Sequence, residues 1–334
     1  MSRDIHDEVL EGTYWWGIPT LCGAEHDADP ANCDIALVGV PHSTGNGTTE
    51  RDQHLGPRAV RNVSGWLGGR VHMEYGLDPW QAAKVRDLGD VSLPQANNNE
   101  HCISQIMEHY ARIDKAGARP VSIGGDHSIT GGILKSIAGE GAALTGGQKA
   151  GLLHIDAHTD TYDMLDHFLG ARRSAAHWGS YLVKEGHVDA SRSVQIGLRG
   201  HTRSLDWLKS SYDLGYEVIT MERYRSEGAE ACCEIIRERL GDGPVYITFD
   251  LDSLDPTIAP AVSNLEPGVN GFSIDEANQL LRAVRGKNVI GGDVVCLMPT
   301  KDQANNITSM VASTVMFEII SLVADCLSNG QKQE

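Results

Sequence analysis

Short apolar runs alternate with longer amphipathic segments along most of the chain, and this alternation limits the folds open to it. Each apolar run ends in a polar or glycine-rich turn, as buried strands do. The predicted strands are 35–40, 121–123, 151–155, 194–196, 217–219, 245–249 and 289–295. Helical periodicity is found at 102–116, 128–138, 178–185, 227–240, 274–284 and 308–327. Strands and helices in alternation indicate an α/β fold, with a parallel sheet that helices cover on both faces.

The chain is long enough for a large hydrophobic core. It has 334 residues, of which 41% are apolar and 22% charged, which is ordinary for a folded globular protein. The predicted elements lie within residues 35–330, which we expect to form a single α/β domain. Residues 1–34 are then an N-terminal extension.

Charge and cysteine usage limit the partners and the compartment. A formal net charge of −17 would repel nucleic-acid phosphate and anionic lipid, whereas it is compatible with a cationic small molecule. The first residues carry no charged and apolar leader, and we find no apolar stretch of the about 20 residues that span a bilayer. The seven cysteines form no CxxC pair, which favours a reducing compartment. We therefore expect a cytoplasmic protein without nucleic-acid or membrane partners.

Six side chains of metal-binding types follow three of the predicted strands. They are His127, Asp156, His158, Asp160, Asp250 and Asp252. Alternate residues of an extended chain share a face, so the three side chains within 156–160 can converge, and so can the two aspartates of the second run. In open parallel sheets, ligands collect beyond the carboxyl ends of the strands. Oxygen and nitrogen ligands without a thiolate suit Mn²⁺, Ni²⁺, Co²⁺ or Zn²⁺ better than Ca²⁺.

Each of these motifs alone has an explanation that needs no metal. A DxD run is commonly a solvated turn, and a lone histidine is commonly hydrogen-bonded in the core. Three pieces at three strand ends favour a centre with two divalent ions. Ions about 3.5 Å apart would bridge a water and lower its pKa, which supplies a hydroxide for attack on a trigonal carbon. His177, in the turn before a predicted helix, is suited to protonate the leaving amine, although a surface histidine is the alternative.

Three motifs in the chain resemble the signatures of the ureohydrolase family, which includes arginase, agmatinase and guanidinobutyrase. They are GGDHS at 124–128, HIDAHTD at 154–160 and FDLDSLDPTIAP at 249–260. The resemblance extends from about Ile35 to the helix that begins near Thr308. It implies a three-layer α/β/α fold with a mainly parallel central sheet. It also implies assembly into trimers or hexamers, made either of identical chains or of this chain with a homologous second subunit.

The resemblance also implies how the ligands are shared. His127, Asp156, Asp160 and Asp250 would bind one ion, and His158, Asp156, Asp250 and Asp252 the other, so that two aspartates bridge. The ions would be Mn²⁺ or Ni²⁺. His177 falls where the family keeps its proton-shuttle histidine. Asp160 would accept a hydrogen bond from the bridging hydroxide, and the hydroxide would attack the guanidino carbon and break a C–N bond.

Substrate choice is where the chain departs from its relatives. The Leu198-Arg199-Gly200-His201 run is similar to agmatinases and argues against arginine as substrate. Cys296 stands where the family has the glutamate that binds guanidinium. A nitrogen that carries methyl groups has no N–H for a carboxylate, so a thiol there favours N-alkylated guanidines or biguanides such as metformin. Guanidine, the substrate of another member of the family, is a further candidate. His54, His201 and Arg203 would line the entrance.

Two other functions remain open. The first is a conventional agmatinase or guanidinobutyrase that recognises its guanidino substrate differently and releases urea. The second, from another class, is a non-catalytic subunit kept for assembly of a heteromeric hydrolase. Six intact ligands and a candidate shuttle histidine argue against the assembly subunit.

Overall fold

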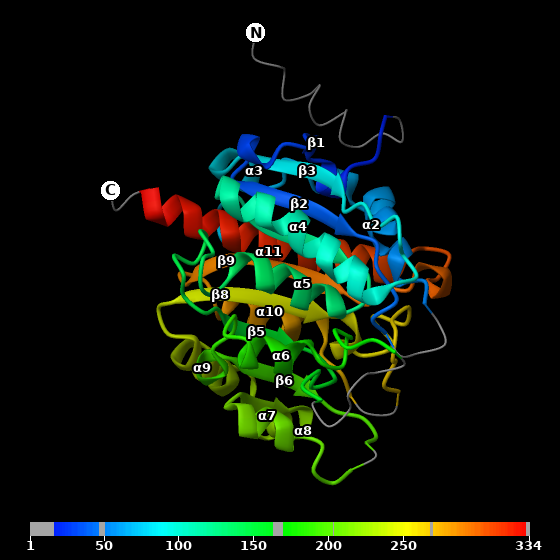
Figure 1. Ribbon diagram of the computed structural model, residues 1–334, viewed down its shortest axis with the longest axis vertical. Helices are drawn as coiled ribbons and strands as arrows, with labels where there is room; N and C mark the ends of the chain where they lie inside the picture. The colour runs from blue at the N-terminus through cyan, green and yellow to red at the C-terminus, as the bar shows by residue number, and fades with distance from the viewer. Residues whose placement is uncertain (1–16, 47–50, 163–169, 203, 268–269, 332–334) are drawn as a thin grey trace.

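A nine-stranded sheet forms the centre of the protein in a computed structural model, which describes residues 17–46, 51–162, 170–202, 204–267 and 270–331 (Figure 1). Every strand pair in this sheet is parallel, in the order β1-β3-β2-β4-β9-β8-β5-β6-β7. The strands are β1 (Glu25–His26), β2 (Ile35–Val40), β3 (Val85–Asp90), β4 (Arg119–Gly124), β5 (Gly151–Ile155), β6 (Val194–Leu198), β7 (Glu217–Thr220), β8 (Pro244–Asp250) and β9 (Asn288–Val295).

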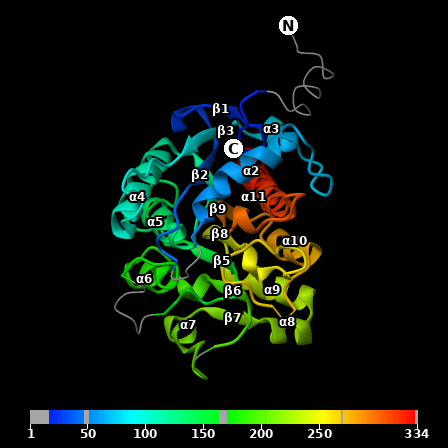
Figure 2. The ribbon, with the colours of Figure 1, turned by 90° about the vertical axis from the view of Figure 1, so that its right-hand side faces the viewer.

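Helices cover both faces of the sheet and make three layers. One layer contains α4 (Asn99–Ala116), α5 (Ser128–Ile137), α6 (Trp178–Lys184) and α7 (Lys209–Leu214). The opposite layer contains α2 (Gly56–Ser64), α3 (Pro79–Ala82), α8 (Met221–Glu227), α9 (Ala229–Leu240), α10 (Ile274–Arg282) and α11 (Ile307–Gln331). Figure 2 shows the two layers on either side of the strands. The predicted three-layer α/β/α fold is confirmed.

Each layer buries its own hydrophobic core against the sheet. Successive strand residues point to opposite faces, so Leu37 and Ile155 lie in the core under α9, α10 and α11, whereas Val38 and Leu152 lie in the core under α4, α5 and α6. Strands buried on both faces are apolar throughout. This is why the seven predicted strands could be found from their apolar runs.

Two strands, the helices α2, α3, α7 and α8, and one helix boundary were not predicted. β1 has two residues, and β3 has the sequence Val-Arg-Asp-Leu-Gly-Asp, whose charged side chains hide the strand. In β3, buried Asp87 is neutralised by Arg61, whose Nη2 lies 3.0 Å from its Oδ1. The predicted helix 227–240 corresponds to α9, which begins at Ala229 because Gly228, with a left-handed φ of 88°, separates it from α8.

The described part of the N-terminal segment packs on the same sheet. Leu21 and Cys22 are fully buried in one of the two cores, and β1 pairs with β3. The division of the chain at residue 34 stays a prediction, but residues 17–34 contribute a strand and core side chains.

The expectation that the chain has no apolar stretch long enough to span a bilayer was wrong for α11. By length and composition, residues 307–330 could cross a membrane, but 72% of the apolar stretch is buried inside the fold. Val315, Ile319 and Val323 of α11 are fully buried in the core beside β9 and α2. The helix is apolar because it is a core helix.

Glu318 of α11 connects this helix to α10 and to the segment around residues 72–75. Its carboxylate accepts hydrogen bonds from His72 Nε2 at 2.9 Å, from Tyr75 Oη at 2.7 Å and from the Arg282 guanidinium at 3.0 and 3.1 Å. Burial raises the pKa of Glu318, but Arg282, His72 and Tyr75 outweigh burial and hold it below its ordinary value. A depressed folded-state pKa gives stability that is present above the ordinary, unfolded-state pKa of 4.5 and is lost as pH falls through the folded-state pKa.

Glu318→Gln should therefore lower the free energy of unfolding at pH 7 by about 2–3 kcal/mol, because buried His72 and partly buried Arg282 lose the charge of the buried carboxylate. The difference in free energy of unfolding between wild type and variant should become smaller as the pH is lowered below 4.5, the ordinary pKa of Glu318. Urea unfolding of both proteins at several pH values measures this difference. Glu234→Gln, at an exposed position on α9, is the control. Equal stability of Glu318→Gln and wild type at pH 7 would contradict the prediction.

Candidate metal centre

The six predicted ligands lie together at one end of the sheet, beyond the carboxyl ends of β4, β5 and β8. β5 and β8 are neighbours, and β9 lies between β8 and β4. His127 follows β4, the three ligands of 156–160 follow β5, and Asp250 is the last residue of β8. Parallel strands bring their carboxyl ends to one edge, so residues far apart in the sequence meet there.

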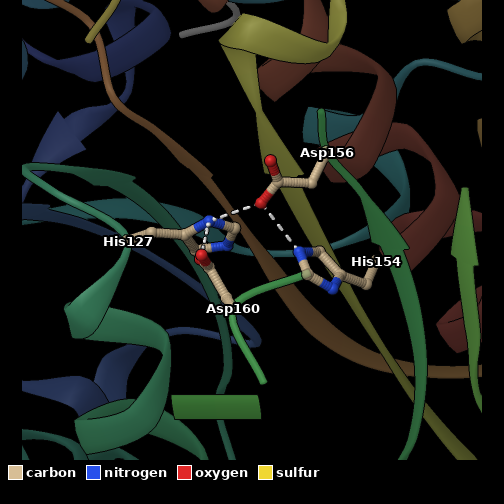
Figure 3. A group of neighbouring side chains, drawn as sticks. All are labelled: His127, His154, Asp156 and Asp160. Carbon is tan, nitrogen blue, oxygen red and sulfur yellow. Dashed lines mark hydrogen bonds and ion pairs between the residues drawn. The ribbon is translucent and has the colours of Figure 1, made fainter. Parts of the chain in front are cut away.

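The first set of ligands surrounds one nitrogen of His127. Its Nδ1 lies 2.9 Å from Asp156 Oδ2, 3.0 Å from Asp160 Oδ2 and 3.2 Å from Asp250 Oδ2. Figure 3 shows the His127 ring directed at Asp156 and Asp160. All four side chains are buried. One nitrogen and three carboxylate oxygens from three strand ends therefore converge on a small volume.

The second set surrounds one nitrogen of His158. Its Nδ1 lies 3.1 Å from Asp252 Oδ2 and 3.5 Å from Asp156 Oδ1. Asp156 thus presents Oδ2 to the first set and Oδ1 to the second, as a bridging carboxylate does. Asp250 presents Oδ2 to the first set, whereas its Oδ1 accepts the backbone N–H of Asp252 at 2.9 Å.

The ligands converge in a different way from the one predicted. β5 ends at Ile155, a bend follows at residues 157 and 158, and Asp160 has a left-handed φ of 50°. Asp252 lies in a 3₁₀ turn, Leu251–Ser253. The period-two geometry of an extended strand therefore does not extend past the strand ends. Aspartate turns replace it: Asp156 Oδ1 accepts the N–H of His158 at 2.7 Å, in the manner of an Asx turn.

His154, which was not among the predicted site residues, orients Asp156. His154 Nδ1 lies 3.0 Å from Gln195 Nε2, an N–H donor, so the His154 Nε2–H is left to donate to Asp156 Oδ2 at 2.8 Å. The residue lies within β5, two positions before Asp156, so strand periodicity would have placed it on the same face. Hydrogen-bonded partners of this kind hold ligands in position.

Thr248 and Asp293, which were also not predicted, hold the His127 ring through its Nε2 atom. His127 Nε2 lies 2.8 Å from Thr248 Oγ1, and Thr248 donates to Asp293 Oδ1 at 2.7 Å. Asp293 also accepts from Thr130 and Tyr246, both at 2.9 Å. These contacts leave Nδ1 as the His127 atom that faces the carboxylates. Nothing in the motif spacing indicated Thr248 or Asp293.

The side chains fit divalent ions, as two buried atoms show. His127 Nδ1 and Asp252 Oδ2 make no hydrogen bond, and each lies within one of the two ligand sets. Burial raises the pKa of Asp252, and Asp250 and Asp156 raise it further against the opposing effect of His158. Burial and Asp156 likewise raise the pKa of Asp250. Crowded buried carboxylates of this kind need positive charge, which divalent ions provide.

His177 lies near the first ligand set, at the start of α6. It is buried, and its Nδ1 lies 2.7 Å from Ser174 Oγ. The next residue, Trp178, donates its Nε1–H to Asp160 Oδ2 at 2.8 Å. The backbone N–H of Gly179 donates to the carbonyl of Asp160 at 2.9 Å, so the start of α6 and the Asp160 backbone are fixed to each other.

The predicted substrate residues are more dispersed. Cys296 is buried, with a left-handed φ of 71°, and its thiol lies against Asp250; burial raises its pKa well above the ordinary value, and Asp250 and Asp252 add to this. His54 is exposed, with Nδ1 3.0 Å from the Arg51 carbonyl. His201 is exposed. Arg203 lies outside the described residues. Neither His54 nor His201 joins a ligand set, so their place at an entrance stays a prediction.

Comparison with known proteins agrees with this geometry. Residues 33–321 match the profile of the Arginase family. Guanidinopropionase of Pseudomonas aeruginosa is 34% identical over 97% of this chain and 98% of its own length. Human mitochondrial guanidino acid hydrolase is 34% identical over 91% of this chain and 82% of its own length.

Among solved structures, proclavaminate amidino hydrolase from Streptomyces clavuligerus superposes with a TM-score of 0.84 and 31% identity, covering 93% of this chain and 99% of that one. A hypothetical agmatinase from Burkholderia thailandensis superposes with a TM-score of 0.80 and 31% identity, covering 95% and 93%. The fold, the shared motifs and the family match over most of the chain agree: the protein belongs to the arginase family and is a ureohydrolase-type enzyme, a hydrolase of carbon–nitrogen bonds.

Proposed function

We propose that the chain is a dinuclear metal hydrolase that releases urea from a small guanidino compound, a guanidino acid or agmatine. The observation that carries this proposal is the convergence of two ligand sets on His127 Nδ1 and His158 Nδ1, with Asp156 between them. The relatives support the substrate class, since those named above include a guanidinopropionase and a guanidino acid hydrolase.

Two Mn²⁺ or Ni²⁺ ions would be held by the six predicted ligands, with Asp156 and Asp250 as candidate bridges. When bound, the ions supply Lewis acidity that activates water for attack on the guanidino carbon. Side chains of the protein hold the ligands in position and transfer the proton. His154 holds the Asp156 carboxylate in position, and Thr248 holds the His127 ring. We assign the proton transfer to the leaving amine to His177, whose Nδ1 is fixed by the Ser174 hydroxyl.

A biguanide such as metformin, or guanidine, is the weaker candidate substrate. It depended on Cys296, and the thiol is buried against Asp250. The relatives favour guanidino acids and agmatine by their names: a guanidinobutyrase of Pseudomonas aeruginosa is 32% identical over 97% of this chain. The conventional alternative is therefore better supported than the biguanide. Assembly into trimers or hexamers and a cytoplasmic location stay predictions.

Product analysis tests the proposal. The purified protein is loaded separately with Mn²⁺ and Ni²⁺ and offered 3-guanidinopropionate, 4-guanidinobutyrate, agmatine, guanidine and metformin. We expect urea together with the matching amine from at least one of the first three compounds. Guanylurea and dimethylamine from metformin, without turnover of the others, would replace our proposal with the biguanide activity. Absence of all products with both metals would favour the assembly subunit.

A further inference from the structure

The metal centre is open to solvent along one edge. The side chains of His127, Asp156, Asp250 and Asp252 are 1–4% exposed, whereas that of Asp160 is 12% exposed and that of His158 27% exposed. A substrate must therefore approach on the side of His158. A carboxylate that is not a predicted ligand lies on this edge, and no part of the site described above uses it.

This carboxylate belongs to Glu266, in the segment between β8 and α10. Glu266 Oε1 lies 3.2 Å from His158 Nε2, the nitrogen opposite the one that faces Asp252, and its side chain is 18% exposed. The group rests on Gly200, where a Cβ would collide with the carboxylate. The absence of a Cβ at Gly200 makes room for Glu266, and its left-handed φ of 97° independently favours glycine at this position.

Two other acidic side chains near the ligands are already engaged. Asp126 accepts the backbone N–H groups of Gly45, Asn46 and Ser128, and it is fully buried. Asp293 is fully buried behind His127. Glu266 differs from both because His158 takes up one of its oxygens and the group still reaches solvent.

The charge balance of the site indicates that Glu266 attracts a cationic substrate. The four predicted aspartate ligands carry four negative charges, which two divalent ions cancel, so the aspartates and the ions together have no net charge with which to attract a guanidinium cation. Cys296, the predicted substrate contact, is buried and uncharged as a thiol. Glu266 adds one negative charge at the exposed edge, where a cation must arrive. Carboxylates and guanidinium groups match as charge-assisted hydrogen-bond partners.

We propose that Glu266 is the carboxylate that binds the cationic guanidinium group of the substrate, with Oε1 held by His158 Nε2–H and its remaining acceptor positions offered to substrate N–H groups. This inference rests on the proposed guanidino activity. It makes Glu266 a specificity-determining residue: compounds with unsubstituted guanidinium N–H groups bind, and fully N-alkylated ones lose this contact.

Glu266→Gln in the metal-loaded enzyme tests the proposal, because it keeps the shape and an oxygen for His158 but removes the charge. We expect KM for the best guanidino substrate to rise about 10- to 100-fold, as for loss of one charge-assisted hydrogen bond, and kcat to fall less. Binding of guanidinium chloride, measured by calorimetry with product-free enzyme, should weaken by the same factor. Metal content should stay at the wild-type level. Asp275→Asn, at an exposed position in the first turn of α10, is the control.

A second variant separates binding from positioning. If Glu266 only orients His158, Glu266→Gln should lose metal and kcat with unchanged KM and unchanged guanidinium affinity, and that result would overturn the proposal. The double variant Glu266→Gln/Cys296→Glu returns a carboxylate to the site and should recover part of the guanidinium affinity. Failure of the proposed function is a separate result, in which wild-type enzyme turns over no guanidino compound. Wild-type turnover with an unaltered KM in Glu266→Gln rejects only the role of Glu266.

Discussion

Asp156→Asn should abolish metal binding at both ligand sets and lower turnover by about 10³-fold or more, because activated water is lost with the ions. Asp156 is the side chain that gives one oxygen to His127 and the other to His158. An amide keeps the shape but removes the charge and one acceptor oxygen. Metal analysis of the purified variant, followed by urea release, measures both losses.

Thermal unfolding gives an independent check on Asp156. Ions that bind only the folded protein add about 2.7 kcal/mol of stability when free metal is at 100 times its Kd. We expect added Mn²⁺ or Ni²⁺ to raise the Tm of wild type and to leave that of Asp156→Asn nearly unchanged. Asp242→Asn, at a fully exposed aspartate, should behave as wild type. A variant that retains two ions per chain would show that Asp156 is not the bridge.

His177→Gln should lower kcat by about 10²- to 10⁴-fold, which is the usual contribution of a general acid. The side chain can still accept from or donate to Ser174, so the local fold should persist. KM and metal content should change little, since His177 belongs to neither ligand set. Steady-state kinetics with the best substrate of the panel, together with metal analysis, measures the effect.

The matched control is His187→Gln, at a partly buried histidine whose Nδ1 lies 2.8 Å from the Ala138 carbonyl. Its kinetics should equal those of wild type. A His177→Gln enzyme with full kcat would move the proton transfer to another group. Loss of metal in the same variant would instead make His177 a structural support of the Asp160 backbone.

The sequence was sufficient to predict those strands that are apolar on both faces. Ile35–Val40 and Gly151–Ile155 are buried on both sides, so the apolar run coincides with the strand. β3 could not be found in this way, since Asp87 is acceptable in the core only because Arg61 reaches it from α2. Pairing between distant residues leaves no periodic signal in either segment.

The convergence of the six candidate ligands was predictable for a related reason, whereas the residues that hold them in position were not. Ligands of metal-binding types gather in short motifs after strands, whereas Thr248, Asp293 and Gln195 are ordinary polar residues whose importance depends on which strands are neighbours. Glu266 illustrates the same limit, because it is 108 positions from His158 in the sequence and lies at hydrogen-bond distance from it in the fold.

The left-handed backbone of Asp160 limits which amino acids this position can accept during evolution. Glycine and asparagine tolerate a φ of 50°, but neither supplies a carboxylate to the centre. Glutamate supplies the carboxylate, but it tolerates this backbone less well and would extend the oxygen by one methylene. Aspartate satisfies both demands. Any lineage that drifts to asparagine here keeps the left-handed backbone while it gives up a ligand, so a natural variant of this kind would be well folded and poor in metal.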